Sequence, residues 1–129
     1  MIVADTNLIV YLLIPGDRTT KVQHFYLRDP EWAAPFLWRS ELINVLVTYH
    51  RLKGLDLGVC EQLIAQAERI MEGRSYTLES RAILEVAART GCAGYDAEFV
   101  ALAEYLRVPL VTYDEKLLRR CRSVARKPW

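Results

Sequence analysis

Apolar residues recur at helical spacing along much of the chain. The segment 37–53 is the clearest case, because Leu42, Val45, Leu46 and Tyr49 follow one another at i, i+3, i+4 and i+7, and Gly54 supplies a stop. Comparable spacing elsewhere, bounded by turn-forming residues, completes the set of helices. The pattern predicts helices over 7–13, 20–27, 37–53, 57–71, 78–89, 96–107 and 116–121.

Short β-prone runs alternate with these helices. We expect strands over 2–4, 31–34 and 108–112, and a last edge strand over 122–125. Strands that alternate with longer helices are typical of an α/β fold with a mostly parallel sheet, covered by helices on both faces. No repeat, low-complexity tract or Pro/Gly-rich linker divides the sequence, so we expect one domain over residues 1–129.

Composition and charge narrow the choice of function only slightly. With 17 Lys and Arg against 16 Asp and Glu, the net charge of +1 neither demands nor excludes a nucleic-acid partner. The three cysteines, Cys60, Cys92 and Cys121, are odd in number and far apart, and His24 and His50 lack the spacing of metal ligands. The first five residues lack the basic region and the long apolar run of a signal peptide, and no apolar run in the sequence is long enough to span a bilayer. We therefore expect a cytoplasmic protein without a membrane partner.

Four acidic residues stand at positions where a ligand site is expected. Asp5 directly follows the first predicted strand and Asp114 directly follows a later one, so both should lie at the carboxyl edge of the sheet, where ligands bind in such folds. Asp96 lies at the start of a predicted helix, after a loop. Glu41 precedes Leu42 on the apolar stripe of its helix, and an acid that borders a buried face costs free energy unless it has a partner.

Each of these acids also has a purely structural explanation. Aspartate is a favoured helix N-cap, which would account for Asp96 and Asp114, and Asp5 could form an Asx turn with the next residue. Glu41 could pair with Arg39. Capping does not explain, however, why three aspartates gather at one edge together with a glutamate at the border of an apolar stripe.

Carboxylates gathered at one edge would repel one another. Two like charges about 4 Å apart repel by roughly 4 kcal/mol at an effective dielectric constant near 20, so such a cluster needs cations or raised pKa values. Oxygen ligands without His or Cys suit Mg²⁺ or Mn²⁺ better than zinc. One or two such ions can activate a water and stabilise a leaving oxygen, and the chemistry predicted is therefore phosphodiester hydrolysis.

Four segments carry a resemblance to a known family. They are residues 3–7 (VADTN), 40–46 (SELINVL), 95–103 (YDAEFVALA) and 109–117 (PLVTYDEKL). In this order they resemble PIN-domain nucleases and, within that group, the VapC-type toxins of toxin–antitoxin pairs. The resemblance spans nearly the whole chain, although residues 54–80 match nothing distinctive.

The resemblance implies a fold, an activity and partners. The implied fold is a three-layer α/β/α sandwich, and the implied activity is Mg²⁺- or Mn²⁺-dependent cleavage of RNA by the toxin of a type II toxin–antitoxin system. The implied metal ligands and catalytic residues are Asp5, Glu41, Asp96 and Asp114. The implied supporting residues, through hydrogen bonds, are Thr6, Asn7 and Thr112. Expected partners are RNA, a cognate antitoxin and a second copy of the chain. Glu98 lies near these acids in the sequence and is expected at a solvated helix position.

Two other classes of protein share part of this pattern. A haloacid-dehalogenase-like phosphatase needs a second aspartate two residues after the first, where this chain has Asn7. A response-regulator receiver domain needs a lysine after its last strand, where this chain has Asp114. A PIN-like nuclease of RNA processing, one that acts on DNA, and a catalytically silent RNA-binding or dimerisation module stay open as alternatives.

The stretch from 116 to 127 is the candidate surface for RNA, because it carries six cations and no acid. The alternative is a solvated helix and tail. The residues predicted to contact RNA are Lys116, Arg119, Arg120 and Arg122. Base stacking by Trp32, Trp38 or Trp129 is a further possibility, but packing is the preferred role for each.

Overall fold

The sheet has five strands within residues 1–128, which are the residues that the computed structural model describes. The strands are β1 (Ile2–Ala4), β2 (Trp32–Pro35), β3 (Ser75–Tyr76), β4 (Leu110–Val111) and β5 (Ala125–Arg126). Their order is β3-β2-β1-β4-β5, and every neighbouring pair is parallel. The predicted parallel sheet is confirmed, and β1 and β4 lie side by side at its centre with Ala4 opposite Val111.

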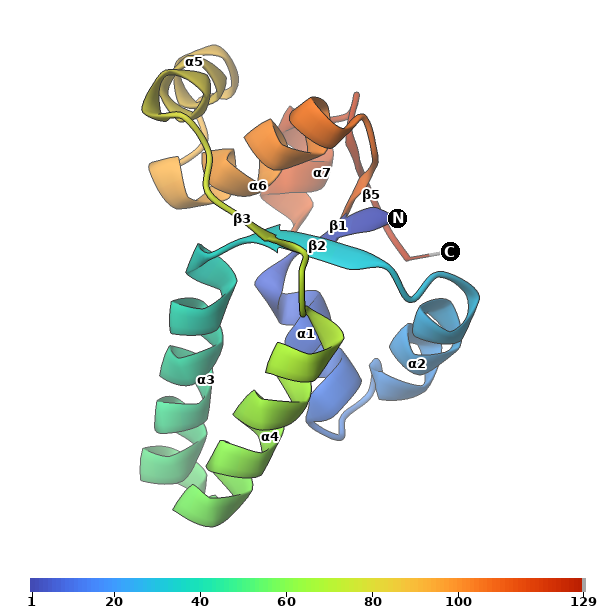
Figure 1. Cartoon of the computed structure of the whole chain (residues 1–129), viewed down its shortest axis with the longest axis vertical. Coiled ribbons are helices and arrows are strands. Elements are labelled where there is room, and N and C mark those ends of the chain that lie inside the picture. The colour runs from blue at the N-terminus through green and yellow to red at the C-terminus, as the bar shows by residue number, and fades with distance from the viewer. Residues whose placement is uncertain (129) are drawn as a thin grey trace.

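Helices cover both faces of this sheet, as the three-layer prediction requires. They are α1 (Thr6–Leu13), α2 (Thr19–Arg28), α3 (Leu37–Lys53), α4 (Leu57–Ile70), α5 (Ser80–Thr90), α6 (Gly94–Leu106) and α7 (Glu115–Arg120). In Figure 1, α1 to α4 lie below the sheet and α5 to α7 lie above it. The chain crosses from one layer to the other through β3, which leads from α4 to α5.

Most predicted boundaries agree with the structure to within about two residues, but two strands do not. Gly54 and Gly91 end α3 and α5 in the left-handed conformation, as the sequence indicated. β3 was not predicted, because two half-buried residues give no periodic signal; its pairing with β2 defines it instead. The last strand was predicted three residues too early, since residues 122–124 form a turn before β5.

The core lies on both sides of the central strands. All residues of β1 and β4 are buried, as expected for parallel strands that are covered on both faces. The predicted packing role of two tryptophans is confirmed, because Trp32 and Trp38 are buried and donate hydrogen bonds to Asp29 O and Ser75 Oγ, each at 2.8 Å. Trp129 lies outside the described residues. The core therefore packs against the strands whose carboxyl ends carry Asp5 and Asp114.

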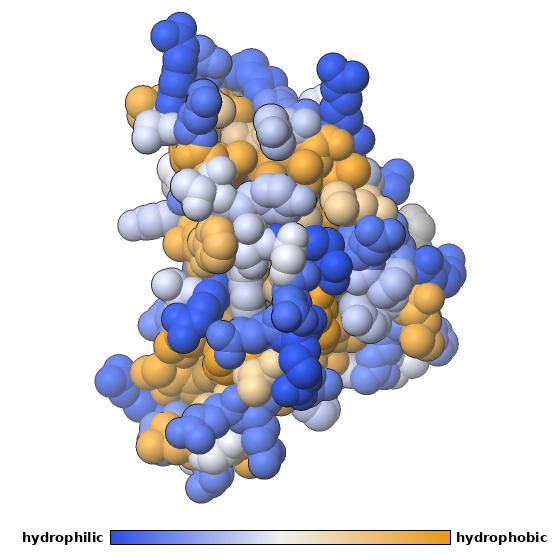
Figure 2. Space-filling view, viewed as in Figure 1, coloured by the Kyte–Doolittle hydropathy of each residue, from blue (hydrophilic) through white to orange (hydrophobic). Residues whose placement is uncertain are grey.

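The surface mixes hydrophilic and hydrophobic residues, and Figure 2 shows hydrophobic patches between hydrophilic ones over the region of α3 and α4. A groove of about 340 Å³ lies between these helices, lined by Ile43, Val47, Leu57 and Ile64 among others. No helix within the described part of the chain has both the length and the apolar character needed to cross a membrane.

Candidate functional site

The structure brings the four singled-out acids to one cleft. Asp5, Glu41, Asp96 and Asp114 line a cavity of about 250 Å³ at the carboxyl edge of the sheet. The first and last of these acids follow β1 and β4, which are hydrogen-bonded neighbours, so the sheet itself sets them beside each other. The other two come from helices on opposite layers, α3 and α6, and complete the cleft from either side.

Asp5 is fixed by a contact across the sheet. It occupies the N-cap position of α1, but its side chain makes no capping hydrogen bond. Instead, the buried Thr112 hydroxyl donates to Asp5 Oδ2 at 2.6 Å. Neither the cap nor the Asx turn therefore accounts for this carboxylate.

Burial raises the pKa of Asp5 from its ordinary value of 3.8 to about 6. The hydrogen bond from Thr112 opposes that rise of the pKa, because it favours the charged form. The other three acids of the cleft all add to the rise through charge repulsion. Asp5 is thus the acid whose pKa is raised by the charges of all three of the others.

Glu41 faces the cleft and not the arginine on its own helix. The Thr6 hydroxyl donates to Glu41 Oε1 at 2.6 Å, whereas Arg39 pairs with Glu68 at 3.5 Å on the exposed surface. The alternative of a Glu41–Arg39 pair is therefore wrong. Burial raises the pKa of Glu41, and the charges of Asp96 and of the half-buried Glu98 add to the rise.

Asp96 lies within the first turn of α6 and does not cap the helix, because the N-cap position belongs to Ala93. Its half-buried carboxylate has a raised pKa, first through burial and then through the charge of Asp114. The nearby Lys116 lowers the same pKa. Helix capping therefore does not explain Asp96.

Asp114 does cap a helix, and it lines the cleft as well. Its Oδ1 accepts a hydrogen bond of 2.9 Å from Leu117 N at the start of α7. Its own backbone N–H donates to Thr112 Oγ1 at 2.9 Å. The Thr112 hydroxyl therefore links Asp5 to Asp114. Asp114 both caps a helix and lines the cleft, so its structural role does not exclude the functional one.

Two further polar residues line the cleft. Asn7, predicted as a supporting residue, is exposed there and makes no side-chain hydrogen bond within the described residues. Asn44 was not singled out by the sequence argument, although it lies one helical turn after Glu41 and on the same side of α3. The spacing of i and i+3 on one helix was the signal that could have identified it.

The donor set fits a hard divalent cation, since four carboxylates and two amides offer oxygen ligands with no His or Cys among them. As the side chains lie, no three His, Cys, Asp or Glu residues in the described part of the chain are arranged to hold one ion together. A shared ion would therefore require side-chain adjustment. The pKa values of Asp5, Glu41 and Asp96 are raised because like charges share a partly buried space. The same arrangement would favour the binding of a cation.

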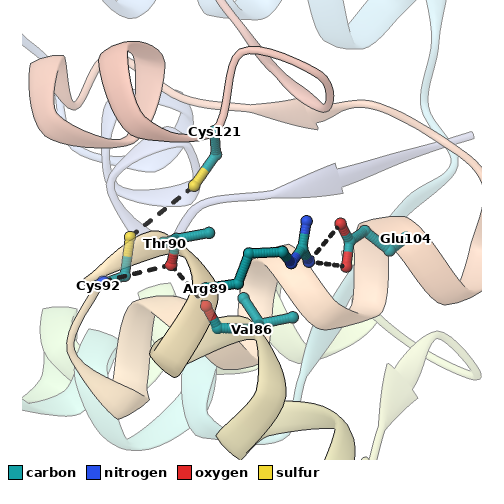
Figure 3. Close-up of polar contacts among 6 residues, drawn as sticks. All are labelled: Val86, Arg89, Thr90, Cys92, Glu104 and Cys121. Carbon is teal, nitrogen blue, oxygen red and sulfur yellow. Dashed lines mark hydrogen bonds and ion pairs between the residues drawn. The ribbon is translucent and has the colours of Figure 1, made fainter.

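Contacts at the end of α5 fix the loop that leads into α6, on which Asp96 lies (Figure 3). Thr90 Oγ1 donates to Val86 O at 2.7 Å and accepts from Cys92 N at 3.3 Å. The Cys92 and Cys121 sulfurs are 3.8 Å apart, and the described cysteines are all free thiols. Burial raises the pKa of Cys121 to about 11, which favours the protonated thiol at neutral pH. Both cysteines serve here as buried packing residues that connect α7 to the α5–α6 loop.

The predicted basic rim is divided in space. Lys116 lies close enough to the cleft for its charge to act on Asp96, and Arg119 is exposed on the same short helix. Arg120 instead donates to Gly91 O at 2.8 Å. Arg122 lines a different concavity, beside the residues that precede β4. RNA contact stays a prediction for all four of these residues.

Comparisons with known proteins show what this chain is similar to and which family it belongs to. The chain is similar over its whole length to FitAcB from Neisseria gonorrhoeae, with 18% identity, a TM-score of 0.74 and 99% of that chain covered. It is also similar to a toxin–antitoxin complex from Klebsiella pneumoniae, with 18% identity, a TM-score of 0.69, and coverage of 100% of this chain and 98% of that one. No curated protein sequence matches it significantly. The family model of the PIN domain matches residues 2–123, and the chain therefore belongs to the PIN domain family.

Proposed function

We propose that this PIN-domain protein is an endoribonuclease that depends on Mg²⁺ or Mn²⁺ and hydrolyses RNA phosphodiester bonds. The observation that carries the proposal is the convergence of Asp5, Glu41, Asp96 and Asp114 on one small cleft at the carboxyl edge of the sheet. A surface that only bound phosphates would gain nothing from bare carboxylates. The same residues suit catalysis, because a bound cation would offset their repulsion and attract the substrate.

The four carboxylates are the proposed ligands for one or two divalent ions. When bound, such ions would polarise the scissile phosphate and activate a water for in-line attack. Two threonines orient the carboxylates: the Thr112 hydroxyl donates a hydrogen bond to Asp5, and the Thr6 hydroxyl donates one to Glu41. Asn7 and Asn44 offer amide groups at the rim of the cleft, where they can hydrogen-bond to water or to the substrate.

We further propose that the protein is the VapC-type toxin of a type II toxin–antitoxin pair and acts in the cytoplasm. The fold shared with a chain of a toxin–antitoxin complex, which matches this chain over its whole length, supports this role. The apolar groove between α3 and α4 supports a protein partner, because such grooves commonly receive an apolar helix face. The proposed partners are therefore RNA, a cognate antitoxin and a second copy of the chain. Expression of the protein alone should slow growth, and co-expression of the antitoxin should relieve it.

The substrate and the metal requirement are tested together with purified protein. Single-stranded RNA should be cleaved with Mg²⁺ or Mn²⁺ and left intact with EDTA, while DNA of the same sequence should be cleaved poorly. Preferential cleavage of the DNA would favour a PIN-like deoxyribonuclease. Binding of RNA without any cleavage, under every metal condition, would favour a silent binding module, and growth unaffected by an active nuclease would favour RNA processing.

A further inference from the structure

A second concavity, of about 640 Å³, lies beside the starts of β4 and β5. Three arginines from separate segments line it: Arg107 after α6, Arg122 after α7 and Arg126 in β5. The residues just before β4 line it too, whereas Asp114 lies three residues after the other end of β4. The concavity and the carboxylate cleft therefore lie at opposite ends of the same strand.

Within residues 1–128, no acid pairs with the three arginines of this concavity. All three arginines are exposed, and within the described residues none of them makes a side-chain hydrogen bond or ion pair. Glu104 is the acid among the lining residues, and both of its carboxylate oxygens accept from Arg89 Nη2, at 2.7 and 2.8 Å (Figure 3). Its charge is therefore already paired, and three guanidinium groups are left to attract an anion.

The backbone at Arg107 is a second, independent observation. This residue ends α6 in the left-handed conformation, with φ of 58°. At the ends of α3 and α5 the chain uses Gly54 and Gly91 for the same conformation, in which an L side chain is disfavoured. Arg107 has positive φ without being glycine, and no other such residue occurs in the described part of the chain. A strained position that keeps a long cationic side chain indicates a use for that side chain.

We propose that the concavity formed by Arg107, Arg122 and Arg126 binds phosphate groups of a nucleic-acid strand, as a site separate from the carboxylate cleft. The guanidinium fork matches phosphate oxygens, and a lining with three arginines suits a sugar–phosphate backbone better than a peptide with apolar anchors. The choice of nucleic acid as the ligand rests on the proposed function. A strand bound at this concavity would be retained while another part of it occupies the cleft, and the two contacts together would raise its affinity.

The test measures binding and not cleavage, so that it does not depend on catalysis. A fluorescent single-stranded RNA is titrated against Asp96→Asn protein in metal-free buffer at several KCl concentrations. The triple variant Arg107→Ala, Arg122→Ala, Arg126→Ala should bind more weakly, and the slope of log affinity against log salt should fall by about two units, at about 0.7 per phosphate contact. The matched control, Arg28→Ala, Arg51→Ala, Arg69→Ala, removes the same charge from exposed ends of α2, α3 and α4 and should keep the slope.

A single variant guards against misfolding as the explanation. Arg107→Gly should melt at the same or a higher temperature than the parent protein, because glycine prefers this backbone conformation, and yet bind RNA more weakly. Equal affinity and slope for the two triple variants would overturn the proposal, as would arginine-dependent binding of polyglutamate but not of RNA. If the arginines matter for binding while the wild-type protein cleaves no RNA, the proposed activity fails and this binding site stands.

Discussion

Two threonine hydroxyls orient the carboxylates of the cleft. Thr112 is fully buried, and its hydroxyl donates to Asp5 while it accepts from the backbone of Asp114. Thr112→Val keeps the shape but removes both hydrogen bonds, and a buried polar group that loses its partner typically costs about 1–3 kcal/mol. We expect lower stability, in urea unfolding, and weaker cleavage for Thr112→Val. Thr112→Ser should retain most of both, and equal losses for Ser and Val would show that the hydroxyl is not the cause.

Asp5 makes the stability of the metal-free protein dependent on pH. Its pKa is about 6 in the fold against 3.8 as its ordinary value, so the folded state holds this proton more tightly than the unfolded state. This contribution to stability is fully present below about pH 4 and is lost as pH rises through about 6, by at most about 3 kcal/mol. Asp5→Asn removes the titration and still accepts from Thr112. Urea unfolding in EDTA should show Asp5→Asn gaining on the wild type from about pH 5 to about pH 7.5.

The matched control for this prediction is Asp17→Asn, which neutralises an exposed aspartate that does not line the cleft. Its stability should follow that of the wild type at every pH. An Asp5→Asn protein that lost stability relative to the wild type toward neutral pH would contradict this account. It would mean that burial and charge repulsion do not destabilise the charged form of Asp5 in the fold.

Among the elements, the short helix α7 depends on a residue that also belongs to the site. Asp114 caps this six-residue helix through Leu117 N, and Asn is as good a cap as Asp, whereas replacement by Ala costs about 1 kcal/mol. Asp114→Asn and Asp114→Ala should both lose cleavage, and only Asp114→Ala should also melt at a lower temperature. Thermal melting without metal separates the two effects. An active Asp114→Asn protein would mean that this residue is a cap alone.

The elements also show which features of the fold the sequence could predict. The helix of residues 37–53 was predicted with its observed bounds, because the apolar stripe and Gly54 define both its face and its end. β3 was missed because its pairing with β2 is a tertiary property of a two-residue segment. The basic stretch after Asp114 looked continuous in the sequence, but the turn at 122–124 carries Arg122 away from the cleft, and no local pattern indicated where that turn would lead.

For the whole molecule, the parallel sheet explains why the acids could be grouped in advance. Strand-end acids of a parallel sheet share one edge, so Asp5 and Asp114 were predictable neighbours. The partners of the carboxylates were not predictable, because whether Thr6 turns to Glu41 depends on how α1 packs against α3. Membership of the PIN domain family also removes the phosphatase and receiver-domain readings.

Metal binding should stabilise the whole fold. A cation that binds only the folded protein adds about 2.7 kcal/mol at a hundred times its Kd. The melting temperature at about pH 7.5 should therefore rise with Mn²⁺ or Mg²⁺, and the gain should fade as the pH falls below about 6, where Asp5 takes up its proton. The double variant Glu41→Gln, Asp114→Asn should respond much less. A response equal to that of the wild type would locate the ion elsewhere.

The most direct test of the central claim, that the carboxylate cluster catalyses RNA cleavage with a divalent metal, is the cleavage rate of Asp96→Asn protein. This variant keeps the size of the side chain, and it does not disturb a helix cap, because Ala93 holds that position. With Mg²⁺ and labelled single-stranded RNA, the rate should fall to the background of the EDTA control, while circular dichroism shows a folded protein and Asp17→Asn cleaves as the wild type does. Cleavage by purified, folded Asp96→Asn at the wild-type rate would contradict the claim.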